Sequence, residues 1–170
     1  MSRRLPVALA AAALTLTLLT ASTMAAPPQV FVTPLTGDEE VPARDTLARG
    51  FAGFQLSPDG ETMTYILIAS NIENVVASHI HIGAFGTNGP VTVFLFGNAP
   101  AGGGRHDGIL ATGTFTQADF IGPLAGMDMD DLVAAINAGG AYVNVHTNDG
   151  DATPNEGPGD FPGGELRGQL

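Results

Sequence analysis

The stretch Val75–Ile82 reads VVASHIHI, and its second half alternates histidine with isoleucine. A period of two is typical of a β-strand with one face in a core. In such a strand His79 and His81 point to the same face, about 7 Å apart along the chain. Ile80 and Ile82 then point to the opposite face. We therefore expect a strand that buries its isoleucines and turns its two imidazoles outward.

Seven further segments alternate in the same way, and glycine- and proline-containing turns such as SPDG at 57–60 and TNGP at 87–90 separate them. Many short strands between such turns indicate a β-sandwich or a closed sheet. One segment, residues 130–137, predicts a short helix that ends before Gly139 and Gly140. We expect an all-β domain of about eight strands with one short helix. The seven segments are residues 30–35, 50–56, 62–68, 91–96, 109–115, 141–146 and 165–170.

The N-terminal 25 residues have the pattern of a signal peptide. Arg3 and Arg4 precede an apolar run at 5–20, and small residues around Ala25 suit a cleavage site. The run is short for a membrane span, although an uncleaved anchor is the alternative. We expect a signal peptide over 1–25, a single domain over 26–170, and a secreted or periplasmic protein with no membrane contact after cleavage.

Composition excludes several classes of function. The chain has 17 acidic and 6 basic residues, so without Arg3 and Arg4 it has 17 against 4, a net charge of −13. An acidic surface disfavours nucleic acid and anionic membranes and favours cations. Cysteine is absent, which excludes thiol catalysis, thiolate metal sites and disulfides. An exported domain of this kind must rely on its core, on a metal, or on both.

A third histidine has matching parity on a later strand. In residues 141–146, Val143 and Val145 form the core-facing pair, so Asn144 and His146 point outward with Tyr142. If this strand lies next to Val75–Ile82, three neutral imidazoles converge. Copper and zinc favour that ligand set. The sequence thus predicts a copper or zinc site; the alternative is ordinary exposed histidines.

The metal ligands that we predict are His79, His81 and His146, with copper preferred and zinc as the alternative. His106 lies in the glycine-rich segment 98–107 and is either a fourth ligand or a plain loop residue. A longer acidic segment, 148–164, has Pro154 where an EF-hand requires glycine. We expect a solvated loop there, with a weak calcium site as the alternative. No nucleophile–base pair or phosphate loop stands out, so we do not expect an enzyme.

Several motifs, in order along the chain, resemble those of the CHRD (chordin-type) domain family. They are LTG at 35–37, EVP at 40–42, DG at 59–60, SHIHIG at 78–83, GPV at 89–91, AYVNVHT at 141–147 and GGELRGQL at 163–170. Such domains occur repeated in chordin, an extracellular antagonist of growth factors, and singly in bacterial exported proteins. The resemblance implies a fold more than a function.

The His-x-His strand and the later strand histidine also resemble the copper ligands of copper/zinc superoxide dismutases. This resemblance implies a Greek-key β-sandwich in which His79, His81 and His146 hold copper. The bridging histidine and zinc-site aspartate of those enzymes have no counterpart here, and their disulfide is impossible without cysteine. Three functions remain open: metal binding or storage, a metal-free extracellular interaction module with protein partners, and a dismutase-like redox enzyme.

Overall fold

The computed structural model describes residues 28–151 and 157–170. The predicted signal peptide and the middle of the acidic segment therefore lie outside the described residues. The described part contains eight strands, one α-helix and three short 3-10 turns. These are β1 (Val30–Thr36), β2 (Arg49–Leu56), β3 (Thr62–Glu73), β4 (Val75–Ile82), β5 (Val91–Phe96), β6 (Arg105–Thr116), β7 (Ala141–Thr147), β8 (Leu166–Gln169), α1 (Met129–Asn137), η1 (Gly37–Glu39), η2 (Gln117–Asp119) and η3 (Gly122–Leu124).

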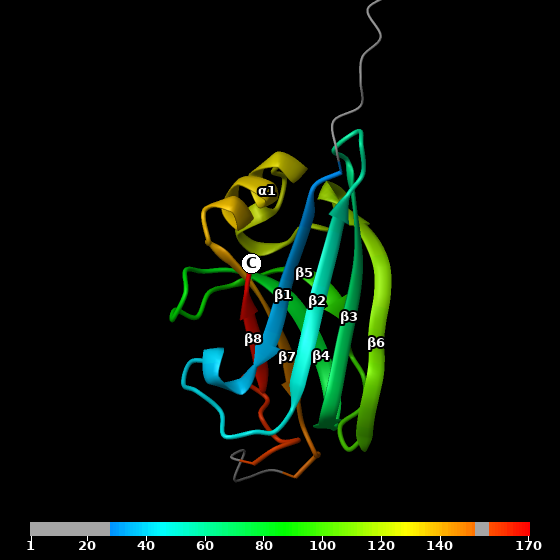
Figure 1. Ribbon diagram of the computed structural model, residues 1–170, viewed down its shortest axis with the longest axis vertical. Coiled ribbons are helices and arrows are strands. Elements are labelled where there is room, and N and C mark those ends of the chain that lie inside the picture. The colour runs from blue at the N-terminus through cyan, green and yellow to red at the C-terminus, as the bar shows by residue number, and fades with distance from the viewer. Residues whose placement is uncertain (1–27, 152–156) are drawn as a thin grey trace, which may run out of the picture.

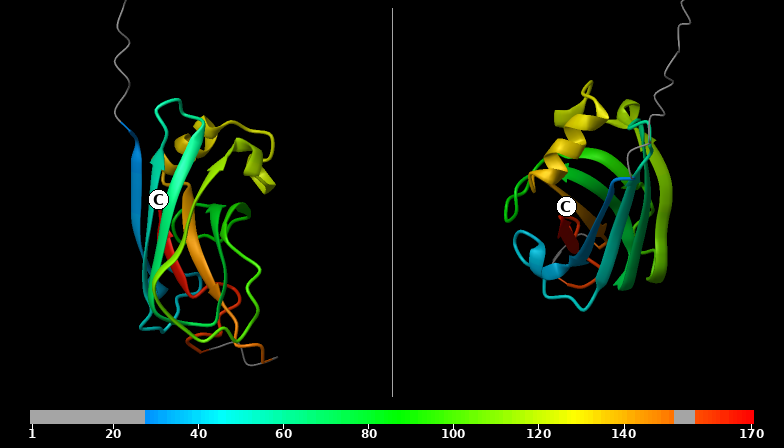
Figure 2. Two further views of the ribbon diagram at one scale, coloured as in Figure 1. Left: turned by 90° about the vertical axis from the view of Figure 1, so that its right-hand side faces the viewer. Right: turned by 45° about the horizontal axis from the view of Figure 1, so that its top comes forward.

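The strands form one antiparallel sheet in the order β5-β4-β7-β8-β1-β2-β3-β6. The sheet curls until it is nearly closed, as the two views of Figure 2 show. The Tyr65 hydroxyl on β3 donates to the Leu95 carbonyl on β5, at 2.6 Å, and so links the two ends of the strand order. Consecutive strands β3 and β4 lie far apart in that order, which is typical of Greek-key connections. The prediction of an all-β fold with one short helix is confirmed.

The core lies between the two halves of the curled sheet. Leu35 and Leu67 face it from one half, Ile80 and Val143 from the other, and all four are fully buried. The isoleucine and valine pattern in the sequence predicted this orientation. Helix α1 covers one end of the core with its apolar face, and Asp128 with Asp131 forms a capping box at its start. Burial of these side chains supplies most of the stability of a domain without disulfides.

Strand β6 begins earlier than the sequence indicated. His106 lies inside it, opposite Ile72 of β3, rather than in a loop. The expectation of a loop was wrong because β3 continues to Glu73 and offers partners to residues before Ile109. The glycine-rich loop is correspondingly shorter and ends at Gly104.

The two halves of the sheet differ in what covers their outer surfaces. We name the outer surface of β4, β7 and β8 the covered face, because loops from three parts of the chain meet over it. Asn88 Nδ2 donates to the Val41 carbonyl, and Arg44 Nε donates to the Gly164 carbonyl. His79 and His81 lie on this face but are only 9% and 7% exposed. Parity placed them on the correct face, and their burial disagrees with the alternative of ordinary exposed histidines.

Candidate metal centre

The register of β4, β7 and β8 arranges the outward side chains of the covered face as a grid. His79 stands opposite Asn144, and His81 stands opposite Tyr142. On β8, the other neighbour of β7 in the sheet, Arg167 stands opposite Asn144. His146 follows Asn144 on the same face of β7, diagonal to His79. The pairing of β4 with β7, which sequence alone could not establish, is what brings the histidines together.

The three imidazoles form a compact triangle. One ring nitrogen from each of His79, His81 and His146 lies within 4.8 Å of the others. The shortest contact joins His79 Nδ1 to His146 Nε2, at 3.1 Å. Ring centroids are 5.5 Å apart for His79 and His81, and 6.2 Å apart for His81 and His146. A zinc ion or copper ion is bound at roughly 2.0–2.1 Å from imidazole nitrogen, so a slight contraction would let all three reach one ion.

Backbone carbonyls fix the tautomers of two of these rings. His81 Nδ1 lies 2.8 Å from the Gly89 carbonyl oxygen, and His146 Nδ1 lies 2.8 Å from the Pro162 carbonyl oxygen. A carbonyl only accepts, so each Nδ1 carries the proton and each Nε2 presents a lone pair. This carbonyl-to-imidazole arrangement is the usual outer support of metal-binding histidines.

His81 Nε2 is the atom that fits a metal most directly. It is buried and has no hydrogen-bond partner among the described residues. His146 Nε2, by contrast, accepts the proton of His79 Nδ1 when no ion is present. Buried polar atoms in native proteins are nearly always paired, so an unpartnered lone pair inside a histidine triangle is suited to binding a cation.

All three imidazoles are held in the neutral form that binds metal. Burial, reinforced by the charges that His146 and His81 would carry, lowers the pKa of His79 from 6.5 to about 4. Burial also lowers the pKa of His81 and of His146, and the Gly89 and Pro162 carbonyls oppose part of that effect. Because imidazolium cannot coordinate, these lowered pKa values favour metal binding at neutral pH.

Aromatic neighbours immobilise the triangle. Tyr142 stacks on His81, with ring centroids 4.8 Å apart and an interplanar angle of 12°. The Tyr142 hydroxyl accepts from the Gly89 amide at 3.0 Å, and the guanidinium of Arg167 lies 3.5 Å from the centre of its ring. Phe94 meets His79 edge to face at 4.6 Å. Little rotation remains for His81 or His79, so the site is largely preorganised.

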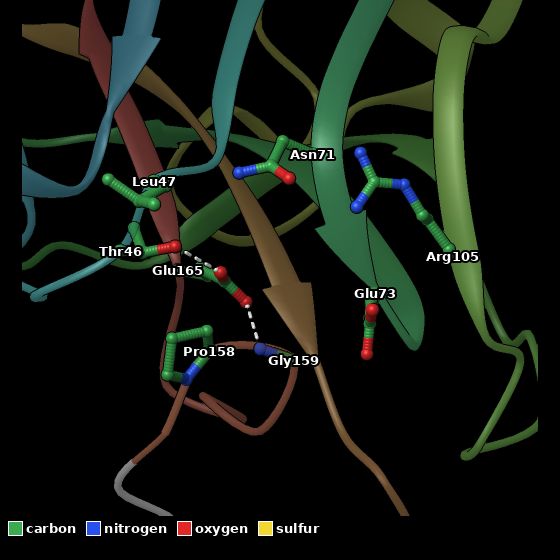
Figure 3. A pocket seen from close by; sticks show the side chains of 8 residues that line it. All are labelled: Thr46, Leu47, Asn71, Glu73, Arg105, Pro158, Gly159 and Glu165. Carbon is green, nitrogen blue, oxygen red and sulfur yellow. Dashed lines mark hydrogen bonds between the residues drawn. The ribbon is translucent and has the colours of Figure 1, made fainter.

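Glu165 holds the segment that supports His146. This fully buried carboxylate accepts hydrogen bonds from Thr46 Oγ1 at 2.6 Å, Thr147 Oγ1 at 2.7 Å and the Gly159 amide at 2.8 Å. Figure 3 shows two of these bonds beside a hollow of about 210 Å³ that none of the three histidines lines. Through this network the chain is fixed just before Pro162, the partner of His146. Glu165 makes no ion pair in the described residues, where Arg105–Asp107 is the single one.

The structure does not bring His106 into this group. The cluster of described residues that could hold a metal ion contains His79, His81 and His146, while His106 Nε2 lies 3.3 Å from the Gly108 carbonyl oxygen on β6. Its exclusion follows from its place in the sheet, because β6 lies at the end of the strand order remote from β7. The fourth position of the centre is therefore not filled by histidine.

The family assignment rests on a match to the CHRD domain over residues 31–154. The chain belongs to the CHRD domain family. All three histidines of the triangle lie within the matched range, whereas Pro162 and Glu165 lie beyond it. No curated protein and no solved structure matches the chain. The likeness to superoxide dismutases therefore has no support from relatives.

CHRD domains are typically extracellular or periplasmic, which agrees with the expected export. Over 28–151 and 157–170, no helix is long and apolar enough to cross a membrane. The cleavage site and the domain limits at 25 and 26 stay predictions.

Sequence reasoning overlooked the supporting residues of this CHRD domain. The alternation of residues 141–146 did predict that Tyr142 and Asn144 point outward. This was the available sequence signal for the side chains nearest to the histidines. The carbonyls of Gly89 and Pro162 had no signal, because every residue carries one. Their roles depend on loop conformation and became visible only in the structure.

Proposed function

We propose that this CHRD domain binds one copper ion through His79 Nδ1, His81 Nε2 and His146 Nε2, with zinc as the alternative metal; on binding, the His79 proton moves from Nδ1 to Nε2. The observation that carries the proposal is the orphaned, buried Nε2 of His81 inside a triangle of neutral imidazoles. Lone pairs fixed by backbone carbonyls at His81 and His146 support it. The proposed role is metal binding or storage outside the cytoplasm.

Copper is preferred over zinc for a thermodynamic reason. Among divalent first-row metals, nitrogen sites bind Cu²⁺ more tightly than Zn²⁺. The site has no thiolate, since the chain lacks cysteine, and three imidazoles suit both metals. The net charge of −11 also raises the local concentration of cations around the protein.

The two other functions have weaker support. A dismutase-like enzyme needs superoxide, an anion, to approach a strongly acidic protein, and the histidines lie under loops. A metal-free interaction module leaves the orphaned His81 Nε2 unexplained. The outer surface of β1, β2, β3 and β6 is apolar, which favours association with another protein chain. Such association is compatible with metal binding.

Metal analysis of the exported mature protein, purified without chelators or a histidine tag, tests the proposal. We expect close to one copper per chain, and loss of that copper in the double variant His79→Ala, His146→Ala. The variant His106→Ala is the matched control and should keep its copper. Circular dichroism of each metal-free variant checks that the all-β fold is retained. A wild-type protein that stays metal-free after loading with copper and with zinc would contradict the proposal and favour the interaction module.

A further inference from the structure

Asn144 occupies the middle of the covered face. Its register neighbours are His79 on β4 and Arg167 on β8, and Tyr142 and His146 flank it along the same face of β7. The residue is only 3% exposed, and its side chain is close enough to His81 to oppose part of the fall in the His81 pKa by hydrogen bonding. Asn144 is therefore a neighbour of each of the three histidines.

The side-chain oxygen of Asn144 is a second buried acceptor without a partner. Asn144 Oδ1 can accept from the His81 ring only when that ring is protonated, because in the neutral form Asn144 Oδ1 and His81 Nε2 are both acceptors and neither has a donor among the described residues. Buried polar atoms are nearly always paired, so two unpartnered acceptors side by side need a common explanation. Both atoms are electron-pair donors, and a cation between them would satisfy both.

We propose that Asn144 Oδ1 is an oxygen ligand of the same metal, so that the centre has three nitrogen donors and one oxygen donor. This inference rests on the proposed function. Carbonyl oxygen is a hard donor, whereas Cu(I) prefers soft ligands. The oxygen therefore makes the centre selective for Cu(II) and Zn(II) over Cu(I). The ion that the protein binds or stores is therefore divalent.

Two substitutions at this position separate the oxygen from the volume of the side chain. Asn144→Leu removes the oxygen and keeps a similar size, while Asn144→Asp keeps an oxygen and adds charge. We expect Asn144→Leu to weaken Cu(II) binding by about tenfold or more, as loss of supporting groups at metal sites does, while Cu(I) binding changes little. We expect Asn144→Asp to raise the ratio of Cu(II) to Cu(I) affinity. The electron paramagnetic resonance spectrum of the Cu(II) form should change in the leucine variant.

The readouts distinguish this inference from the metal centre itself. Equal Cu(II)-to-Cu(I) affinity ratios and identical spectra for wild type and Asn144→Leu would overturn the oxygen ligand and leave the three-histidine centre intact. Such a result would mean that water or hydrogen bonding within the apoprotein satisfies Asn144. If the leucine variant fails to fold, an unchanged ratio in Asn144→Asp overturns the inference in the same way. Absence of metal in the wild type would overturn both.

A separate observation concerns the other half of the sheet. We name the outer surface of β1, β2, β3 and β6 the bare face; Figure 1 shows these four strands side by side. Val30, Val32 and Ile109 on it are 59%, 59% and 60% exposed. Three successive rows across the four strands contain no charged residue, in a chain with 17 acidic and 6 basic residues. The rows are Pro34, Phe51, Ile68 and Ile109; Val32, Gly53, Ile66 and Thr112; and Val30, Gln55, Thr64 and Thr114.

The bare face is hollowed at its centre. A side chain at Gly53 would meet the ring of Phe51 at 3.1 Å and the side chain of Ile66 at 3.3 Å, so the absence of a side chain makes room for the Phe51 ring. A depression of about 450 Å³ lies over these residues. Such a contiguous apolar patch on an exported domain marks an association surface.

We further infer that the bare face binds a second copy of the chain, sheet against sheet. In any other pairing of two copies, acidic surfaces would face each other, because the net charge of the protein is −11. The bare face is neutral, so the same face on two copies can pack together in a symmetric dimer. Four strands about 4.8 Å apart, with three outward residues each, give a patch of roughly 400 Å². A standard stable interface buries about 800 Å² per partner, so the dimer is weak and reversible.

Sedimentation equilibrium tests this dimer at protein concentrations up to about 1 mM, the weak end of specific association. We expect a monomer–dimer equilibrium that shifts toward dimer at high salt, because screening reduces the repulsion between acidic copies. Val32→Lys should abolish the dimer. Phe85→Lys is the matched control and should leave the dimer unchanged, because Phe85 is an apolar residue, 68% exposed, that lies outside the bare face. A monomer at every concentration, or a dimer indifferent to Val32→Lys, would overturn the inference.

Discussion

His79 is the residue of the centre whose pKa burial lowers furthest. Its pKa is 6.5 in the unfolded chain and about 4 in the folded protein. Between these values the unfolded chain binds more protons, so stability falls as the pH falls through this window. Above the folded-state pKa the ring stays neutral and able to bind metal. Unperturbed histidines would already lose metal near pH 6.5.

Because burial lowers the pKa of all three rings below 6.5, we expect copper to keep raising the melting temperature at pH values below 6.5, and to lose this effect by about pH 4, where even His79 becomes protonated. Thermal unfolding with and without copper across this range measures the effect. The double variant His79→Ala, His146→Ala serves as the control for copper bound elsewhere. A copper effect that disappears by about pH 6.5 would show that burial does not protect these rings.

His81 illustrates a conflict between stability and binding. Its Nε2 is buried without a partner, which destabilises the metal-free protein. We expect His81→Phe to keep the stacking on Tyr142, to abolish metal binding, and to leave the metal-free protein as stable as wild type within about 1 kcal/mol. Chemical denaturation measures the free energy of unfolding. Ile80→Ala, which opens the core from the opposite face of β4, is the contrasting variant and should cost about 2–5 kcal/mol. A comparable loss in His81→Phe would mean that the ring is structural.

Among the elements, the loop between β4 and β5 supports the site most directly. A side chain at Gly89 would meet the Ile82 carbonyl oxygen at only 1.8 Å, so this position accepts glycine alone. Gly89 supplies both the carbonyl for His81 and the amide for Tyr142. We expect Gly89→Ala to displace the loop and weaken copper binding by about ten- to a hundredfold, the usual effect of losing outer-shell support.

Isothermal titration with copper measures the effect of Gly89→Ala. The control is Gly86→Ala in the same loop, where no atom lies within 4 Å of the added carbon, although its φ of 72° also favours glycine. Gly86→Ala strains a left-handed backbone position, whereas Gly89→Ala clashes with the Ile82 carbonyl, and only the latter is expected to move the His81 partner. Equal copper affinities in the two variants would show that the Gly89 carbonyl is dispensable.

The same elements show how far sequence reasoning reaches. Apolar alternation predicted all eight strands, and parity assigned His79, His81 and His146 to one face, because both follow from a repeat of two residues. The adjacency of β4 and β7 needed the structure, since it depends on which strands pair over long sequence distances. The loops over the covered face were also beyond prediction. Their conformation is fixed by contacts such as Arg44 with Gly164, between residues far apart in the chain.

For the molecule as a whole, the curled sheet separates stability from the proposed binding. The apolar core lies on the inner surface, while the histidine triangle lies on the covered face, with β4 and β7 between them. The metal-free domain therefore has a complete core. The covered face has loops and a buried polar cluster, whereas the bare face has neither and stays apolar. One sheet can in this way present two independent surfaces, one for an ion and one for a second chain.

Bound metal should add to the stability of a domain that has no disulfide. A ligand at a hundredfold excess over its dissociation constant stabilises the folded state by about 2.7 kcal/mol. For a domain of this size that corresponds to a rise in melting temperature of roughly 5–10 °C. We expect this rise for wild type with copper by differential scanning calorimetry, and none for His79→Ala, His146→Ala, whose metal-free form should still unfold cooperatively because its core is intact. The same rise in the double variant would assign the stabilisation to other groups, such as exposed carboxylates. A double variant that is unfolded without metal would show instead that the triangle is part of the structural core, and that the two surfaces of the sheet are not independent.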